Sequence, residues 1–451
     1  MALTIEQNPL YTLNPVGQEV IFTVSDLTTV GAYFNVKYVA EVHISTVDID
    51  LATTTAIVGT FKTTPNNTGV GMYDFRPILE SFVSPDNLAA LGSEYKGAAT
   101  TAIKTHPLHL VDKYSLNDNV LRYLKIRFTI EGSDTDTGTV LPIAGEEEDS
   151  VQYTLINGYL KHTDLLNIFN GDFGYDTQIF KLNEFVSPGD IVGEYLTNAP
   201  LTQYANDTDY GTISFISTEV GTDGILANMI VTYYDSSGTA IGTADEIPNT
   251  DANGGFTTFT TATKNQLIHF GCFPANLQNW STNFAAVLAL GTLSYYTVVA
   301  ENSAGNKITE TLRVNLLCPT LKGYEPIRLT WLNQWGVWDY YTFKMKSTKS
   351  ISTKGSTYQQ LAGTWNESIY LPNGYKGGKK AFRVNAMEKI SMNTDFVNES
   401  ESEWFEELIN SPEVYILEGF QTDPSFSSLN TYVTPARLTT SSFTRKTVAN
   451  D

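Results

Sequence analysis

Apolar and polar residues alternate with a period of two over much of this chain, which is the pattern of half-buried β-strands. Between residues 19 and 51 several such segments follow one another, and further strands are predicted at 56–61 and 123–130. Strands of this length separated by polar turns favour a β-sandwich or barrel. The clearest alternations are Val20-Phe22-Val24, Phe34-Val36-Tyr38 and Val42-Ile44.

A second group of strands is predicted in the middle of the chain. Its members are residues 212–216, 229–234, 266–273, 292–300 and 308–317. Asp235-Ser236-Ser237-Gly238 is a good hairpin turn between strands. The segment YYTVVAENSAGNKITETLRV resembles the last hairpin of fibronectin type III and immunoglobulin-like domains. This resemblance implies a fold more than a function, because unrelated binding and structural modules share it.

The stretch from Tyr324 to Lys349 holds three of the six tryptophans. Ile327, Leu329 and Trp331 alternate with more polar residues on its first arm, and the second arm runs from Tyr341 to Lys346. A short loop that ends at Gly336 lies between the arms. The pattern predicts an antiparallel hairpin with one aromatic face and one lysine-rich face, which needs further strands to cover the aromatic side.

Helices are few in this pattern. A short helix is predicted near Pro77, and a longer one at 402–410, where glutamates lie near the N-terminal end and Ser411-Pro412 ends it. Residues 145–149 are predicted as an acidic loop. The fold class is therefore mainly β, with several β-sandwich (Ig-like) domains and a few short helices. The predicted parts are an N-terminal β-domain at 1–155, a connector at 156–200, an Ig/fibronectin-III-like sandwich at 201–320 and a C-terminal β-domain at 321–451.

The net charge of −21 is unevenly distributed. From residue 322 onward there are 14 basic and 14 acidic residues, which leaves 28 − 14 = 14 basic and 49 − 14 = 35 acidic residues before it. One interpretation is solubility. The other is that copies meet front to back, with an acidic surface against the more basic last part, as in a heterologous ring contact.

Sequence motifs for catalysis are missing. The chain contains no P-loop, dinucleotide-binding, nucleophile-elbow or zincin motif. His106 and His109 form the closest histidine pair and lack acidic or cysteine partners, and Asp48-Ile49-Asp50 and Asp134-Thr135-Asp136 lack the further ligands that calcium needs. We therefore expect no enzyme activity, no catalytic or metal-binding residue and no cofactor. A glycosidase carboxylate pair and a bridge between Cys272 and Cys318 stay open as alternatives.

Basic residues cluster after the tryptophan-rich stretch. They could bind the phosphates of a nucleic-acid backbone. The interpretation favoured here is that they protect strand edges or contact protein. Trp335 and Trp338 could stack on sugar rings or anchor a neighbour, or they could fill the core. The interface candidates are Trp335, Trp338, Lys344, Lys346, Tyr375, Lys376, Lys379 and Lys380, and the basic cluster also includes Lys349, Lys354 and Arg383.

One resemblance to a known family rests on short patches in all three thirds of the chain. RLTWLNQWGVWDYYTFKMKSTKS resembles the C-terminal signature of virion structural proteins from short-tailed, crAss-like and related Bacteroidetes bacteriophages. GEYLTNAP (193–200), YGTISFIS (210–217) and GMYDFRPILESFV (71–83) fit the same group.

The resemblance implies a virion protein that is assembled in the host cytoplasm into a ring or barrel of the tail or the head-to-tail connector. Its partners would be copies of itself and other tail or neck proteins. We expect no nucleic-acid contact. The N-terminus shows no export signal and no apolar run is long enough to span a membrane, so no membrane association is expected. The alternative is a surface or adhesin β-sandwich that binds glycans.

Overall fold

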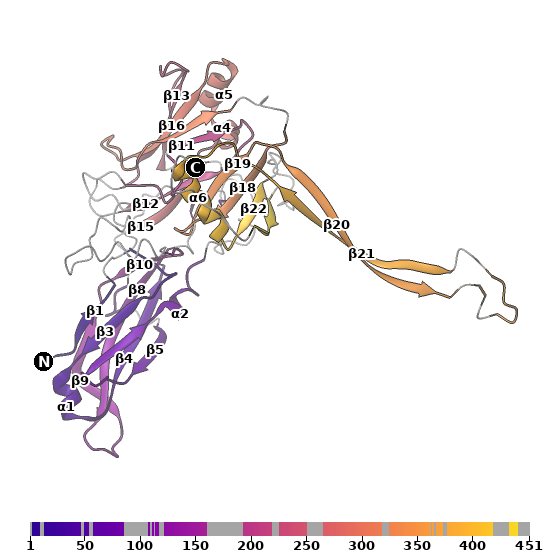
Figure 1. The fold of residues 1–451 in the computed structure, drawn as a ribbon. Coiled ribbons are helices and arrows are strands. Elements are labelled where there is room, and N and C mark those ends of the chain that lie inside the picture. The colour runs from indigo at the N-terminus through magenta and orange to yellow at the C-terminus, as the bar shows by residue number, and fades with distance from the viewer. Residues whose placement is uncertain are drawn as a thin grey trace. The chain divides into compact units, whose positions relative to one another are not determined.

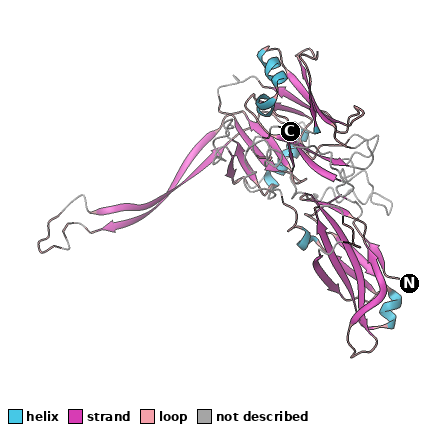
Figure 2. Cartoon of the chain, turned by 180° about the vertical axis from the view of Figure 1, so that it is seen from behind, coloured by secondary structure: helices cyan, strands magenta, loops and turns pink. Residues whose placement is uncertain are grey.

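A computed structural model of the chain describes residues 2–9, 13–46, 49–53, 57–84, 107–108, 111, 113–116, 121–159, 193–218, 225–249, 265–317, 324–361, 363–364, 367–372, 377–417 and 433–440. These residues form several separate sheets with a few short helices (Figure 1 and Figure 2). The predicted fold class, mainly β with several sandwich-like parts, is confirmed.

Two sheets near the N-terminus enclose one core. The first has the order β1 (Thr4–Gln7), β3 (Ile21–Ser25), β6 (Val70–Asp74), and the second has the order β2 (Leu13–Pro15), β10 (Tyr153–Ile156), β8 (Leu121–Ser133), β4 (Phe34–Ser45), β5 (Ile57–Thr63). Phe22 and Val24 of β3 and Tyr38 and Phe128 of the second sheet are buried in a single cluster. Apolar residues on alternate positions of both sheets thus face each other, as in a β-sandwich.

Two short helices belong to this sandwich. Helix α1 (Leu27–Ala32) begins after Asp26, whose carboxylate accepts from the Thr28 and Thr29 amides. Helix α2 (Arg76–Leu79) carries Pro77 in its first turn, so the predicted short helix is confirmed.

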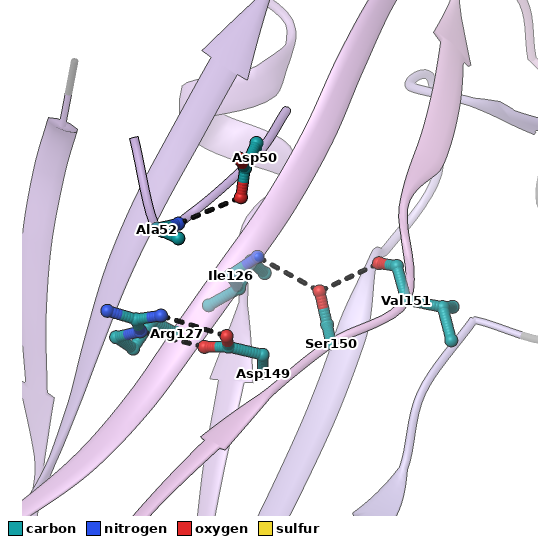
Figure 3. A network of polar contacts seen from close by, with 7 residues as sticks. All are labelled: Asp50, Ala52, Ile126, Arg127, Asp149, Ser150 and Val151. Carbon is teal, nitrogen blue, oxygen red and sulfur yellow. Dashed lines mark hydrogen bonds and ion pairs between the residues drawn. The ribbon is translucent and has the colours of Figure 1, made fainter. Parts of the chain in front are cut away.

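The predicted acidic loop at 145–149 is wrong, because these residues are the end of strand β9 (Leu141–Asp149), which pairs antiparallel with β8. Arg127 of β8 holds Asp149 with two hydrogen bonds of 2.8 and 2.9 Å (Figure 3). The Ser150 hydroxyl accepts from the Ile126 amide at 2.9 Å, next to this ion pair. Cross-strand pairing therefore overrides the low strand propensity of consecutive glutamates.

The middle of the chain forms a second sandwich, and all five strands predicted there are confirmed within a few residues. Its five-stranded sheet has the order β11 (Thr202–Ala205), β17 (Leu312–Leu316), β16 (Tyr295–Glu301), β13 (Asn228–Tyr234), β14 (Asp245–Pro248), and its three-stranded sheet has the order β12 (Thr212–Thr218), β15 (Asn265–Gly271), β7 (Tyr114–Leu116). Helices α4 (Pro274–Trp280) and α5 (Thr282–Ala289) were not predicted. Phe284 of α5 packs into the core beside Tyr233 and Tyr296.

The tryptophan-rich stretch builds a four-stranded sheet of order β19 (Trp338–Phe343), β18 (Ile327–Leu332), β22 (Val414–Leu417), β23 (Val433–Ala436). Leu332, Trp338, Tyr340 and Leu417 of this sheet belong to the same buried cluster as the second sandwich. Sheet and sandwich therefore share one core.

Helix α6 (Glu399–Asn410) confirms the helix predicted at 402–410, and it begins three residues earlier. The Asn398 side chain accepts from the Glu401 amide at 2.7 Å, and the Glu401 carboxylate accepts from the Asn398 amide at 2.9 Å. This reciprocal capping box fixes the start of the helix.

Strands β20 (Thr348–Gln360) and β21 (Gly378–Ser391) form a separate two-stranded antiparallel sheet, here called the arm. Figure 1 shows the two strands paired side by side. Of these residues, the sequence pattern alone predicts a strand only at 381–385. The chain divides into two compact units, and the arm belongs to the smaller one, residues 320–327 and 342–397. The boundaries predicted at 155, 200 and 320 remain predictions.

Candidate functional site

The turn at residues 333–336 lies at a junction of three chain segments. The Asn333 side-chain amide donates to the Leu196 carbonyl at 2.8 Å. The Gln334 carbonyl accepts from the Tyr159 amide, also at 2.8 Å. Asn333 also accepts from the Trp335 amide through its side-chain oxygen, which closes the turn on itself. The turn is therefore bound both to the end of the first sandwich and to the segment that leads into the second.

Gly336 occupies the tightest position of this turn. Its φ of 75° lies in the left-handed region, and a Cβ at this position would come within 2.1 Å of the Asn157 carbonyl oxygen. Both the backbone conformation and the available space require glycine. The glycine predicted to close the loop is thus also the point of closest approach between the two segments.

One face of β18 and β19 packs on the second sandwich. Arg328 is 5% exposed, and its guanidinium donates to the Tyr210 carbonyl at 2.8 Å. It also lies 3.4 Å from the Asp209 carboxylate and 4.5 Å from the centre of the Phe273 ring. A buried arginine is tolerated because an acid, a carbonyl and an aromatic face surround it.

The other face of these strands packs on α6. Trp331 lies 5.0 Å from Trp404, measured between ring centroids, and Tyr341 lies 4.7 Å from Phe405. All six residues of β18 are buried, and β19 has a single half-buried position. The aromatic face is confirmed. The lysines predicted for the other face, Lys344 and Lys346, lie beyond the end of β19 at Phe343, and the part of that face within the strands, which carries Arg328, is covered by the sandwich.

Asp339 is a buried carboxylate between β19, α6 and the 193–200 segment. Its two oxygens accept from the Thr197 hydroxyl and from the Trp404 indole N–H, each at 2.7 Å. Burial raises the pKa of Asp339 to about 6, although the hydrogen bonds from Thr197 and Trp404 oppose that rise. Sequence reasoning missed this residue; the only available signal was an acid within a run of aromatic strand residues.

Glu407 of α6 is a second buried carboxylate. It accepts from the Asn198 side-chain amide and, at 3.5 Å, from the Gln334 backbone amide. Donors from separate segments thus converge on Asp339 and on Glu407. This arrangement holds the segments together through hydrogen bonds, and it keeps the carboxylate oxygens occupied.

The interface candidates of the tryptophan-rich turn lie inside the molecule. Trp335 is 4% exposed and Trp338 is 3% exposed. Of the interpretations given for them, core filling fits this burial. Stacking on a sugar ring or anchoring a neighbouring protein would require exposed tryptophan rings, and both rings are buried.

The basic candidates are distributed differently. Lys346 and Lys379 are exposed, and Lys344 is half-buried. Lys380 is also half-buried and donates to the Gln360 side chain across the arm at 3.0 Å. Lys379 and Lys380 thus lie on one strand of the arm. Tyr375, Lys376, His106, His109, Asp48 and Cys318 lie outside the described residues. Cys272 is a free, buried thiol.

The arm has two chemically different faces, which follow from its register. Residues paired across the strands share a face. Ile351 pairs with Glu388, Gly355 with Val384, and Lys349 with Ile390, so one face carries the branched apolar side chains. This face is mostly open to solvent, with Ile351 70% and Val384 58% exposed.

The opposite face, here called the basic face, carries three basic side chains and also Met387, which pairs with Ser352. Ser350 pairs with Lys389, Lys354 with Asn385, and Ser356 with Arg383. Lys389, Lys354 and Arg383 therefore project from the same side of the sheet. A register shift between residues 356 and 357 places Phe382, 79% exposed, at a bulge beside this basic series.

Within the described ranges, no group of three or more His, Cys, Asp or Glu side chains is placed to hold a metal ion. Nor does any described helix have the length and apolar character needed to cross a membrane. Comparisons with protein-family models and with curated proteins find no match to this chain.

Proposed function

We propose that this chain is a non-enzymatic structural protein of a bacteriophage virion that forms an oligomeric ring or barrel in the tail or the head-to-tail connector. Its partners would be copies of itself and neighbouring tail or neck proteins. The specific class rests on the resemblance of the short sequence patches. The capacity to assemble rests on the arm.

The exposed arm is the observation that carries this proposal. A two-stranded sheet is marginally stable in water when nothing covers it. This one exposes large apolar side chains over much of its length, including Phe382 at 79% and Met387 at 71%. Extensive exposure of large apolar side chains on one element is typical of protein contact sites. Twenty-seven strand residues (13 + 14) without a core of their own are best explained as a contact element.

The patches that carry the phage resemblance have a structural role compatible with this function. Thr197 and Asn198 of the patch at 193–200 bind Asp339 and Glu407. The hydroxyl of Thr212, in the patch at 210–217, lies 3.2 Å from that of Tyr340. These segments fasten the sandwich, the tryptophan-rich sheet and α6 together. In this proposal they supply a rigid body, and other surfaces make the contacts between copies.

The proposal is tested by measuring the mass of the purified full chain. Mass photometry and negative-stain imaging at rising concentration, alone and with co-expressed virion proteins, should show closed oligomers of uniform size. A chain that stays monomeric under all these conditions would refute the proposed function.

A further inference from the structure

The arm and the remainder of the chain carry opposite charge. Strands β20 and β21 contain six basic residues and one acid, Glu388, which gives +5. The whole chain carries −21, so everything outside these strands sums to −21 − 5 = −26. The six basic residues are Lys349, Lys354, Lys379, Lys380, Arg383 and Lys389. A second copy of the same chain therefore offers the arm a surface of complementary sign.

The size of the arm sets how it must be covered. Thirteen paired residues at about 3.3 Å each span about 43 Å, and two strands make a face about 10 Å wide, or about 430 Å². A stable interface buries about 800 Å² on each partner. One face alone is too small, so a stable contact has to cover the apolar face as well as the basic one.

Strand β9 offers the best acceptor for the basic face. Its last four residues, 146–149, are the chain's single run of four consecutive acids. Glu147 and Glu148 are exposed, and β9 pairs with β8 alone among the described strands. The two hydrogen bonds from Arg127 to Asp149 fix the end of this strand on β8 (Figure 3). Glu147 and Glu148 thus project to opposite sides of an anchored edge strand of the first sandwich.

We infer that the arm of one copy docks on the acidic edge of strand β9 of a second copy, with its basic face toward Glu147 and Glu148. The apolar face, with Ile351 and Val384, is covered by the body of that second copy. This contact joins two different surfaces and therefore repeats from copy to copy, which gives a ring when the rotation between successive copies adds up to a full turn. The inference rests on the proposed assembly function and names the contact that produces it.

Nucleic acid is the competing occupant of a basic strand pair. Phosphates would neutralise Lys354, Arg383 and Lys389. They would leave the apolar side chains of the opposite face in water, and the chain's net charge of −21 repels a polyanion. A second copy can supply acidic side chains to the basic face and cover the apolar face, so protein is favoured over DNA.

A charge-swap experiment tests the contact directly. The arm variant is K354E/R383E/K389E, and the edge variant is E147K/E148K. Each variant alone should raise the concentration needed for assembly about tenfold or more, because each places like charges in contact. Combining both sets of substitutions in one chain should restore assembly, because every arm then meets an edge of opposite sign whatever the number of copies.

Two controls accompany the swap. The single variants Lys354→Glu and Lys307→Glu change the charge by the same amount. Lys307 is exposed at a β-bridge outside the arm, so Lys307→Glu should leave assembly unchanged while Lys354→Glu weakens it. All substituted side chains are exposed, so each variant should keep the wild-type unfolding temperature. Wild-type assembly should also weaken between low and high salt.

The outcomes separate the two proposals. Wild-type chain that never assembles overturns the proposed function together with this inference. If the wild type assembles and the arm variant assembles equally well, the arm does not make the contact between copies, and only this inference is overturned. If the variant that combines both sets of substitutions does not recover assembly, β9 is not the acceptor. Binding of duplex DNA that is lost in the arm variant, with assembly unaffected, assigns the basic face to nucleic acid instead.

Discussion

Replacing Asp339 by asparagine should stabilise the protein at neutral pH and change little near pH 4. Asparagine keeps the shape of the site. Its oxygen can accept from the Trp404 indole as the carboxylate does now. Its N–H can donate to the Thr197 hydroxyl oxygen, so this hydroxyl changes from donor to acceptor. The substitution removes a charge that folding takes out of water.

The magnitude follows from the pKa of Asp339, which burial raises from 3.8 to about 6. Between these values the folded protein binds more protons than the unfolded chain, so the free energy of unfolding falls as pH rises through this window. A shift of about 2.2 pKa units corresponds to about 3 kcal/mol, at about 1.36 kcal/mol per unit. Above pH 6 to 7 Asp339 is ionised in both states, so the free energy of unfolding no longer changes with pH through this group.

The assay is urea unfolding followed by tryptophan fluorescence, because Trp331 and Trp404 lie next to the substituted residue. The free energy of unfolding of Asp339→Asn minus that of the wild type should be small at pH 4 and should rise by about 3 kcal/mol at pH 7. Asp235→Asn is the control without a change in this window: the Ser237 hydroxyl lowers the pKa of Asp235 below 3.8, so the pH-dependent contribution of Asp235 lies below pH 4 and its difference should stay nearly constant from pH 4 to 7. A difference for Asp339→Asn that does not change between pH 4 and 7 would refute the reasoning.

Three other substitutions test the packing around the tryptophan-rich sheet. Arg328→Leu leaves Asp209 buried without its cation, so it should cost about 3–5 kcal/mol in thermal unfolding, and a loss under 1 kcal/mol would contradict the buried pair. Gly336→Ala should prevent folding or lower the soluble yield sharply, whereas Gly305→Ala, at a similar positive φ but with open space around it, should cost about 1–2 kcal/mol. Asn398→Ala should cost about 1 kcal/mol in urea unfolding through loss of the capping box, and no change would show that the cap contributes nothing.

Strand positions could be predicted from the sequence wherever one face of a strand is buried, because a period of two then appears in the residues. The strands of the second sandwich follow this rule. Strand β20 could not be predicted, since both of its faces are exposed and its residues are mostly serine, threonine and lysine. The glutamates of β9 were assigned to a loop for the same reason: pairing with β8, and not burial of their side chains, makes them a strand.

The candidate site was predicted in part. The tryptophan-rich stretch was recognised as an organising element, but the sequence does not reveal that both of its faces are covered. Arg328 gave the appearance of a polar face, although Asp209 and Phe273, which surround it, come from distant parts of the chain. Only the fold brings Asp339 and Glu407 to their donors, so no local pattern pointed to these two carboxylates.

The central claim is that the arm joins one copy to the next. An electron cryomicroscopy reconstruction of the assembled wild-type protein tests it most directly. It should show β20 and β21 of each copy lying along β9 of its neighbour, with Lys354 and Arg383 opposite Glu147 and Glu148. An assembly in which both faces of the arm remain in solvent, or in which β9 contacts no other copy, would contradict this account.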